Sequence, residues 1–408
     1  MQSRLSVYIL VVLSNMLISS AAFSVFAQTA GKENPQKDDF GFSLSLKKEN
    51  KKPESEKSIT NDAAEDDEIR IETTLIVNDV LVFDEDKKIV ENLKKEDFII
   101  REDGQPQVVE EFSFGGNEKF PRSVVLIIDH SVSQLPYLQT SIEAAKNLVD
   151  KLDPGDRMAI VTDNVELLQN FTVDKTLLKE KLDSLKKNAL SGKIGKSKQY
   201  SALMAVLNEL LAGENLRPII IFQTDGDELN LLKGEILRNL LLPETLNFGF
   251  QDILTATEKT RTVIYTIIPD LKFVGITDDE KLSRAKTHLI NSEKAFAEVR
   301  RSNFLPEKLK PTEKMLKRRA SELSRQQSAM TKIAEVTGGW AYYLEQSEQA
   351  EKIYTEIMSN MKRRYILGYY PTNQTRDGKK RLIKAEVRGH PEYSVWCRES
   401  YIFGSNEE

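Results

Sequence analysis

Four short apolar runs, separated by segments with helical periodicity, constrain the fold of this 408-residue chain more than any other feature. A strand buried on both faces of a parallel sheet reads as a continuous run of branched apolar side chains. The intervening segments place apolar residues on one helical stripe. This alternation predicts an α/β fold with a doubly wound, mostly parallel six-stranded sheet flanked by helices. The runs are Ser123–Ile128, Met158–Thr162, Pro218–Phe222 and Thr262–Ile268. A further strand is expected at Val165–Gln169, and a last buried strand at Trp340–Leu344.

Strand-like segments also lie on both sides of this α/β region, which we place at residues 120–362. Residues 69–116 and 363–408 alternate apolar and polar side chains between turn signals. One leads into the α/β domain and the other leaves it, so we expect them to pack together as a small accessory β domain. Within the α/β domain, residues 270–326 hold 14 Lys+Arg against 9 Asp+Glu. This basic insertion is interpreted as solvated helix faces, with a partner- or envelope-binding surface as the alternative.

The N-terminal residues predict export. Arg4 precedes an apolar run, Leu5–Ile18, and small residues end at Ala27, the pattern of a cleaved signal peptide over residues 1–27. An uncleaved membrane anchor is the alternative, although serines dilute the run. Residues 28–68 are charged and poor in apolar side chains, which predicts a disordered tether. We therefore expect a periplasmic, cell-surface or secreted protein with no integral membrane segment after cleavage.

Composition argues against several classes of function. The net charge of −5 gives no basic excess for nucleic acid. Cys397 is the single cysteine, so neither an intrachain disulfide nor a thiolate metal site can form, and three scattered histidines make a zinc site improbable. The sequence has no Gly-x-Ser-x-Gly and no His-Glu-x-x-His. We therefore expect no enzymatic activity, and we interpret His130 as a variable loop residue.

Oxygen-bearing side chains follow two of the central strands. Asp129, Ser131 and Ser133 come directly after the first apolar run, and Asp225 follows the run that ends at Phe222. In an open α/β sheet, ligands bind outside the carboxyl ends of the strands. Carboxylates and hydroxyls that converge there make an all-oxygen site suited to Mg²⁺, Mn²⁺ or Ca²⁺, with a coordination position left open.

Asp129-x-Ser131-x-Ser133, with Thr224-Asp225-Gly226 downstream, resembles the metal-ion-dependent adhesion site of von Willebrand factor A domains. The resemblance implies that the two serines bind the metal, most often Mg²⁺, and that Asp225 completes the set. It also implies a hydroxyl ligand from a middle loop. Ser197 aligns with that position, and Ser201 is the alternative.

The resemblance extends over about residues 69–401 to the acidobacterial-type VWFA-related bacterial proteins. Its further motifs are Leu93-x-x-Glu96-Asp97-Phe98, Glu102-Asp103-Gly104, Ile333-Ala334-Glu335-x-Thr337-Gly338-Gly339 and Tyr365-x-Leu367-Gly368-Tyr369. It implies an adhesion-type protein whose ligand supplies an acidic side chain to the metal. The alternatives are a metal-independent cell-envelope scaffold, and a fold that has lost its metal and in which Asp129 and Asp225 only cap helices. A metal-assisted hydrolase would need more carboxylates or histidines.

Overall fold

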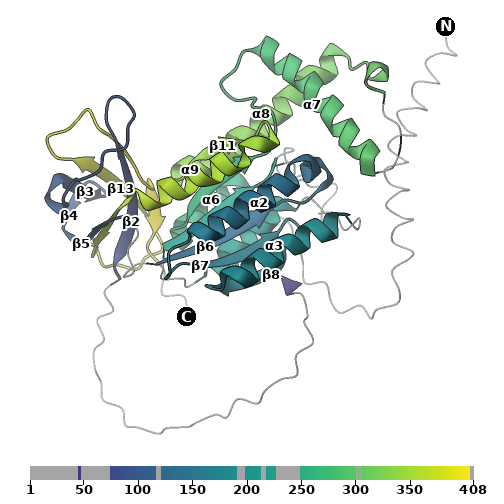
Figure 1. The fold of residues 1–408 in the computed structure, drawn as a ribbon. Helices are drawn as coiled ribbons and strands as arrows, with labels where there is room; N and C mark the ends of the chain where they lie inside the picture. The colour runs from purple at the N-terminus through teal and green to yellow at the C-terminus, as the bar shows by residue number, and fades with distance from the viewer. Residues whose placement is uncertain are drawn as a thin grey trace, which may run out of the picture. The chain divides into compact units, whose positions relative to one another are not determined.

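The computed structural model of the chain describes residues 45–46, 74–115, 121–190, 198–212, 217–226, 249–299, 302 and 305–404 (Figure 1). The expected signal peptide lies outside these ranges. In the part of the chain that is described, no helix has the length and apolar character needed to span a bilayer.

The α/β domain is built on one mixed sheet, and the expected fold class is confirmed. All neighbouring strands in it run parallel except β8, which is antiparallel to β7. The strand order is β1 (Ser45–Leu46), β8 (Glu166–Thr172), β7 (Arg157–Thr162), β6 (Arg122–Ile128), β9 (Arg217–Gln223), β10 (Val263–Ile268) and β11 (Ala341–Tyr343).

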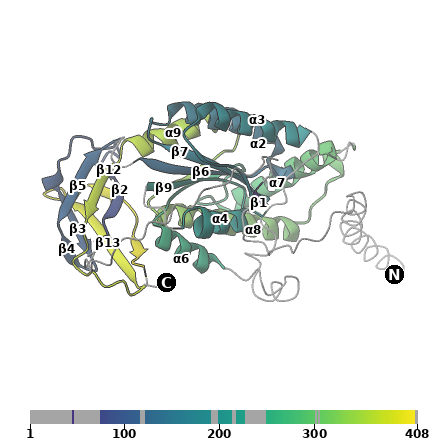
Figure 2. The same cartoon turned by 90° about the horizontal axis from the view of Figure 1, so that it is seen from below.

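Helices cover both faces of this sheet (Figure 2). One face carries α2 (Leu135–Lys151), α3 (Lys175–Leu190) and α9 (Ala350–Lys362), and the other carries α4 (Gln199–Ala205), α6 (Phe250–Thr260) and α8 (Glu313–Val336). Every residue of β6, β9 and β10 is buried, as the continuous apolar runs predict. Val124 and Leu126 pack toward α2, whereas Val125 packs toward α4, so each central strand contributes side chains to both layers of core.

Three expectations are wrong in detail. Ser45 and Leu46, placed in the disordered tether, form a short parallel strand against Glu166 and Leu167 of β8. The last strand, β11, is half-buried because it lies at the sheet edge. The expected end of the insertion at residue 326 falls inside the continuous helix α8.

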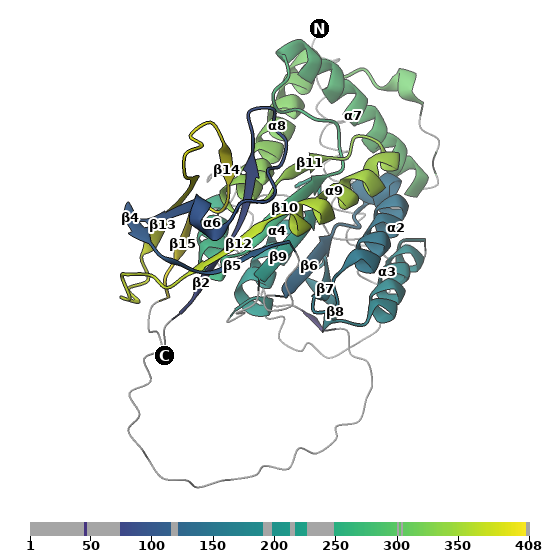
Figure 3. The same ribbon diagram turned by 60° about the vertical axis from the view of Figure 1, so that its left-hand side comes forward.

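The basic insertion folds as two long helices, α7 (Asp278–Val299) and the first part of α8 (Figure 3). They pack around a small apolar core of their own, formed by Phe273, Ala285, Ala320 and Leu323. The short helices within the described ranges are η1 (Lys95–Asp97), η2 (Val132–Gln134), η3 (Val206–Leu210), η5 (Pro306–Lys308) and η6 (Ser347–Gln349).

The terminal β segments pair with each other, which confirms the accessory β domain. One sheet has the order β14-β2-β12-β5 and the other β15-β13-β3-β4, so each combines strands from both ends of the chain. The N-terminal strands are β2 (Ile76–Phe83), β3 (Phe98–Glu102), β4 (Gln105–Gln107) and β5 (Val109–Phe114); the C-terminal strands are β12 (Tyr365–Tyr369), β13 (Lys380–Val387), β14 (Ser394–Trp396) and β15 (Ser400–Ile402).

A buried ion pair joins the accessory β domain to the main sheet. Asp79 of β2 pairs with Arg217 at the start of β9, and both side chains are about 5% exposed. Arg364 lies beside them and donates to the carbonyl oxygen of Asp79 at 3.2 Å, to that of Gly338 at 2.6 Å and to the Tyr265 hydroxyl at 3.1 Å. These contacts fix β2 against strands of the α/β domain.

We expect this ion pair to make stability depend on pH in acid. Burial alone would raise the pKa of the Asp79 carboxyl, but the charge and hydrogen bonds of Arg217 outweigh it and leave the pKa below its usual value. A lowered folded pKa adds stability above the unfolded value, near pH 4, and that stability is lost as the pH falls through the folded pKa. Urea unfolding at pH 6 and pH 3 measures the loss. Between pH 6 and pH 3, the Asp79→Leu/Arg217→Met double variant should lose less stability than the wild type.

A glycine next to β11 permits close packing against β10. A Cβ atom at Gly339 would lie 1.8 Å from the carbonyl oxygen of Ile264. Gly339→Ala should therefore destabilise the protein by about 1–3 kcal/mol or more, because the backbone must shift. Thermal unfolding measures the effect. Gly404→Ala is the matched control, since its Cβ would meet nothing within 4 Å, and equal melting temperatures for the two variants would contradict the prediction.

Candidate functional site

The central sheet brings the two predicted acidic segments together. Ile128 of β6 pairs in register with Gln223 of β9, so both strands end at the same level. The backbone N–H of Asp129 donates to the carbonyl oxygen of Gln223 at 3.0 Å. Asp129 and Asp225 thus follow adjacent parallel strands.

Hydroxyl groups link the two segments. The hydroxyl oxygens of Ser131 and Ser133 are 3.2 Å apart, and the Ser133 hydroxyl donates to Asp225 Oδ2 at 2.6 Å. The backbone N–H of Ser131 donates to Asp129 Oδ1 at 2.9 Å. Four of the five predicted site residues, Asp129, Ser131, Ser133 and Asp225, therefore form one connected cluster, which we call the oxygen cluster. The fifth, Ser197, lies outside the described residues.

Asp129 is the most buried acidic member of the oxygen cluster, at 1% exposure. Its Oδ2 atom accepts hydrogen bonds from Gln199 Nε2 at 2.8 Å and from the Thr224 hydroxyl at 3.1 Å. Burial, followed by the negative charges of Asp163 and Asp225, raises the pKa of Asp129 well above its usual value. A cation among these carboxylates would relieve the repulsion that causes the shift.

Helix capping does not account for Asp129. Ser131 is the N-cap residue of η2, and Gln134 is the N-cap residue of α2. The Asp129 side chain accepts from the backbone N–H of Ser131, two residues on, and so closes a local turn before either helix begins.

Four residues around the oxygen cluster were not predicted as part of the site. Asp163 follows β7 and is fully buried, and its Oδ1 atom accepts from the backbone N–H of His130 at 3.1 Å. The His130 Nδ1 atom lies 2.5 Å from the same oxygen, although without the direction of a hydrogen bond. Gln134 Nε2 donates to Asp225 Oδ2 at 2.8 Å, as Gln199 does to Asp129.

The rule that found Asp129, an acidic residue directly after a buried strand, would also have found Asp163. His130 was noted but taken as a variable loop position. No comparable signal marks the two glutamines, because Gln134 and Gln199 lie within short helices whose other residues are apolar or polar without pattern.

The donor set fits a hard divalent cation. Contacts of 2.6 to 3.2 Å join the Asp225 carboxylate to the hydroxyls of Ser133 and Ser131, and the Asp129 carboxylate joins them through the backbone N–H of Ser131. Oxygen is the ligand atom that Mg²⁺ and Ca²⁺ prefer. Two buried amide oxygens lie beside this set, Oε1 of Gln134 and Oε1 of Gln199, and neither has a hydrogen-bond partner in the described part of the chain. Among the described residues, no group of three or more His, Cys, Asp or Glu side chains is placed to hold a metal ion. The fit therefore depends on neutral oxygens as well as carboxylates.

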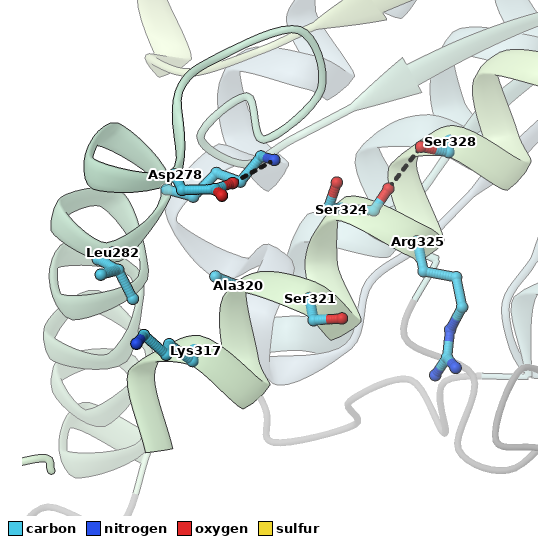
Figure 4. Close-up of a pocket in the computed structure, with 9 residues that line it drawn as sticks. Asp278, Leu282, Lys317, Ala320, Ser321, Ser324, Arg325 and Ser328 are labelled. Atoms are coloured by element: carbon cyan, nitrogen blue, oxygen red, sulfur yellow. Dashed lines mark hydrogen bonds and ion pairs between the residues drawn. The ribbon is translucent and has the colours of Figure 1, made fainter. Parts of the chain in front are cut away.

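A cavity of about 480 Å³ lies elsewhere, between α7 and α8 (Figure 4). Its basic residues are Lys281, Lys317 and Arg325. Lys281 pairs with Asp278 at 3.0 Å, and Lys317 pairs with Glu313 at 2.7 Å. Small-molecule sites are mostly apolar with a few converging polar groups. This cavity does not have that character, and its lining includes no residue of the oxygen cluster.

No family model matches the sequence, and no curated protein matches it. Solved structures with a similar fold include BatB from Bacteroides thetaiotaomicron, at 16% identity and a TM-score of 0.32 over 59% of this chain and 98% of that one. The vWF domain of the type V pili tip protein Mfa5 from Porphyromonas gingivalis matches at 16% identity and a TM-score of 0.29, over 50% of this chain and 96% of that one. The pilus adhesin SpaC from Lactobacillus rhamnosus GG matches at 9% identity and a TM-score of 0.34, over 76% of this chain and 48% of that one. At these values the matches say nothing of what this chain binds.

Proposed function

We propose that this chain is an exported, adhesion-type binding protein without enzymatic activity. In this proposal the oxygen cluster holds one divalent cation, and an acidic side chain of a protein or matrix ligand completes its coordination. The observation that carries the proposal is the convergence of Asp129, Ser131, Ser133 and Asp225 at the ends of β6 and β9.

Each group of the oxygen cluster has a distinct task. Ser131 and Ser133 would supply neutral hydroxyl oxygens, and Asp225 would supply charge. Asp129, held by Gln199, Thr224 and the backbone of Ser131, positions the serine loop and adds negative charge from behind. A bound cation would act as an electrophile, and a shell with few carboxylates leaves it able to attract the carboxylate of a partner.

The alternative is a metal-independent cell-envelope scaffold. The observation that favours it is the pair of helices α7 and α8, which has its own small core and is therefore a preformed surface outside the oxygen cluster. The two functions differ in their response to chelators, because scaffold contacts would not need a cation.

Calorimetric titration of the chelator-treated protein with Mg²⁺, Mn²⁺ and Ca²⁺ tests the proposal. We expect saturable binding of one ion per chain, and a fluorescent peptide rich in Asp and Glu should bind only when that ion is present. Peptide binding that persists in excess chelator would favour the scaffold. No ion binding at concentrations up to 10 mM, a limit set above the weak extracellular Ca²⁺ sites of about 10⁻³ M, would contradict the proposal.

A further inference from the structure

Two glutamine amides are buried against the carboxylates of the oxygen cluster, and each is only half satisfied. Gln199 Nε2 donates to Asp129, and Gln134 Nε2 donates to Asp225. Both residues are 1% exposed. Their carbonyl oxygens have no hydrogen-bond partner within the described ranges. Buried polar atoms are normally paired, and an unpaired one costs free energy, so two such oxygens beside one cluster indicate a ligand.

The surrounding groups indicate which kind of ligand. Among the described residues, the Thr224 hydroxyl and the amide groups of Gln134 and Gln199 already donate to carboxylate oxygens. The Ser133 hydroxyl proton is also directed to a carboxylate. A buried water can donate only two hydrogen bonds and carries no charge to offset the two carboxylates. A divalent cation can take oxygen atoms from all sides at once.

Both glutamines are held by regular structure. Gln199 is the first residue of α4, whose seven residues are all buried, and Gln134 ends η2 and directly precedes α2. Ligands fixed to helix starts are placed more precisely than ligands on loops. Regular structure thus holds both amides against the carboxylates of the site.

We propose that the carbonyl oxygens of Gln134 and Gln199 are ligands of the cation, and that they give the site a preference for Ca²⁺ over Mg²⁺. This inference rests on the proposed function and changes the expected metal. Ca²⁺ takes six to eight oxygens and accepts amide carbonyls, whereas Mg²⁺ demands octahedral geometry and keeps several waters. Two protein carbonyls in place of waters therefore favour the larger ion.

Calorimetric titration with Ca²⁺ and with Mg²⁺ of four proteins tests this inference: the wild type and the variants Gln199→Leu, Gln134→Leu and Gln199→Glu. We expect the wild type to bind Ca²⁺ at least about 10-fold more tightly than Mg²⁺. Each leucine variant should lose about 10–100-fold in Ca²⁺ affinity, the usual range for groups that support a metal site, with a smaller loss for Mg²⁺. Gln199→Glu should keep Ca²⁺ binding, because it retains an oxygen at the same place.

The rise in melting temperature on addition of Ca²⁺ is a second readout, and melting in chelator shows whether each variant folds. If both leucine variants keep the wild-type ratio of Ca²⁺ to Mg²⁺ affinity, the inference is wrong, although the cation site itself stands. Loss of Ca²⁺ binding in Gln199→Glu as large as in Gln199→Leu also overturns it, because the amide then acts through its N–H donation to Asp129. If the wild type binds neither Ca²⁺ nor Mg²⁺, the proposed function is wrong as well.

Discussion

Asp129→Ala should lower the affinity for the divalent cation by more than about 100-fold, since loss of a mere supporting group already costs 10–100-fold. The reason is that Asp129 joins three parts of the site: it accepts from the backbone of Ser131, from Gln199 and from Thr224. Without it, the serine loop loses its anchor and the cluster loses one of its two carboxylates. Calorimetric titration of the variant measures the change.

Asp150→Ala is the matched control for this prediction. Asp150 is an exposed aspartate of α2 that pairs with Lys179, far along the helix from the oxygen cluster. Its replacement should leave the cation affinity unchanged. If Asp129→Ala and Asp150→Ala both bind the cation like the wild type, Asp129 has no part in a metal site and the proposed function is wrong.

Asp79→Ala should destabilise the protein by about 3–5 kcal/mol, the range for breaking a buried ion pair by removing one partner. The variant removes the Asp79 carboxylate from the buried Arg217 side chain at the join between the accessory β domain and the main sheet. Urea unfolding at neutral pH measures the loss. The unfolding transition should also become less cooperative if the accessory β domain opens first.

The double variant Asp79→Leu/Arg217→Met separates charge burial from packing. Apolar replacement of both partners is often neutral or stabilising, so we expect it to recover most of the loss. As a surface control, Glu356→Ala breaks an exposed pair with Lys352 and should change stability by less than about 0.5 kcal/mol. A double variant as unstable as Asp79→Ala would show that the pair contributes through shape rather than charge.

The central sheet and the oxygen cluster could be predicted because both follow from local pattern. A strand buried on two faces must be apolar throughout, and an acidic residue directly after it lies at the carboxyl edge of the sheet. Asp129 and Asp225 were found in this way. Gln134 and Gln199 were not, because an amide in a short helix is ordinary until the structure shows that it is buried against a carboxylate.

Contacts between segments far apart in the sequence could not be predicted. The two residues of β1 end the short alternating stretch Phe40–Leu46, which was assigned to the tether, and they pair with the edge of β8. The buried pairing of Asp79 with Arg217 likewise joins residues 138 positions apart in the sequence. Nothing near either residue indicates its partner.

The interleaved accessory β domain sets an order of events during synthesis. The Tyr365 hydroxyl accepts from the backbone N–H of Leu93 across 272 residues of sequence, and β12 lies between β2 and β5. A chain made from its N-terminus cannot complete either accessory sheet until the last strands have left the ribosome, whereas the strands of the main sheet are made earlier. Any chain that stops before Tyr365 would present the edges of β2 and β5 without their shared neighbour. Unfinished copies should therefore aggregate or be degraded, and only full-length protein should accumulate.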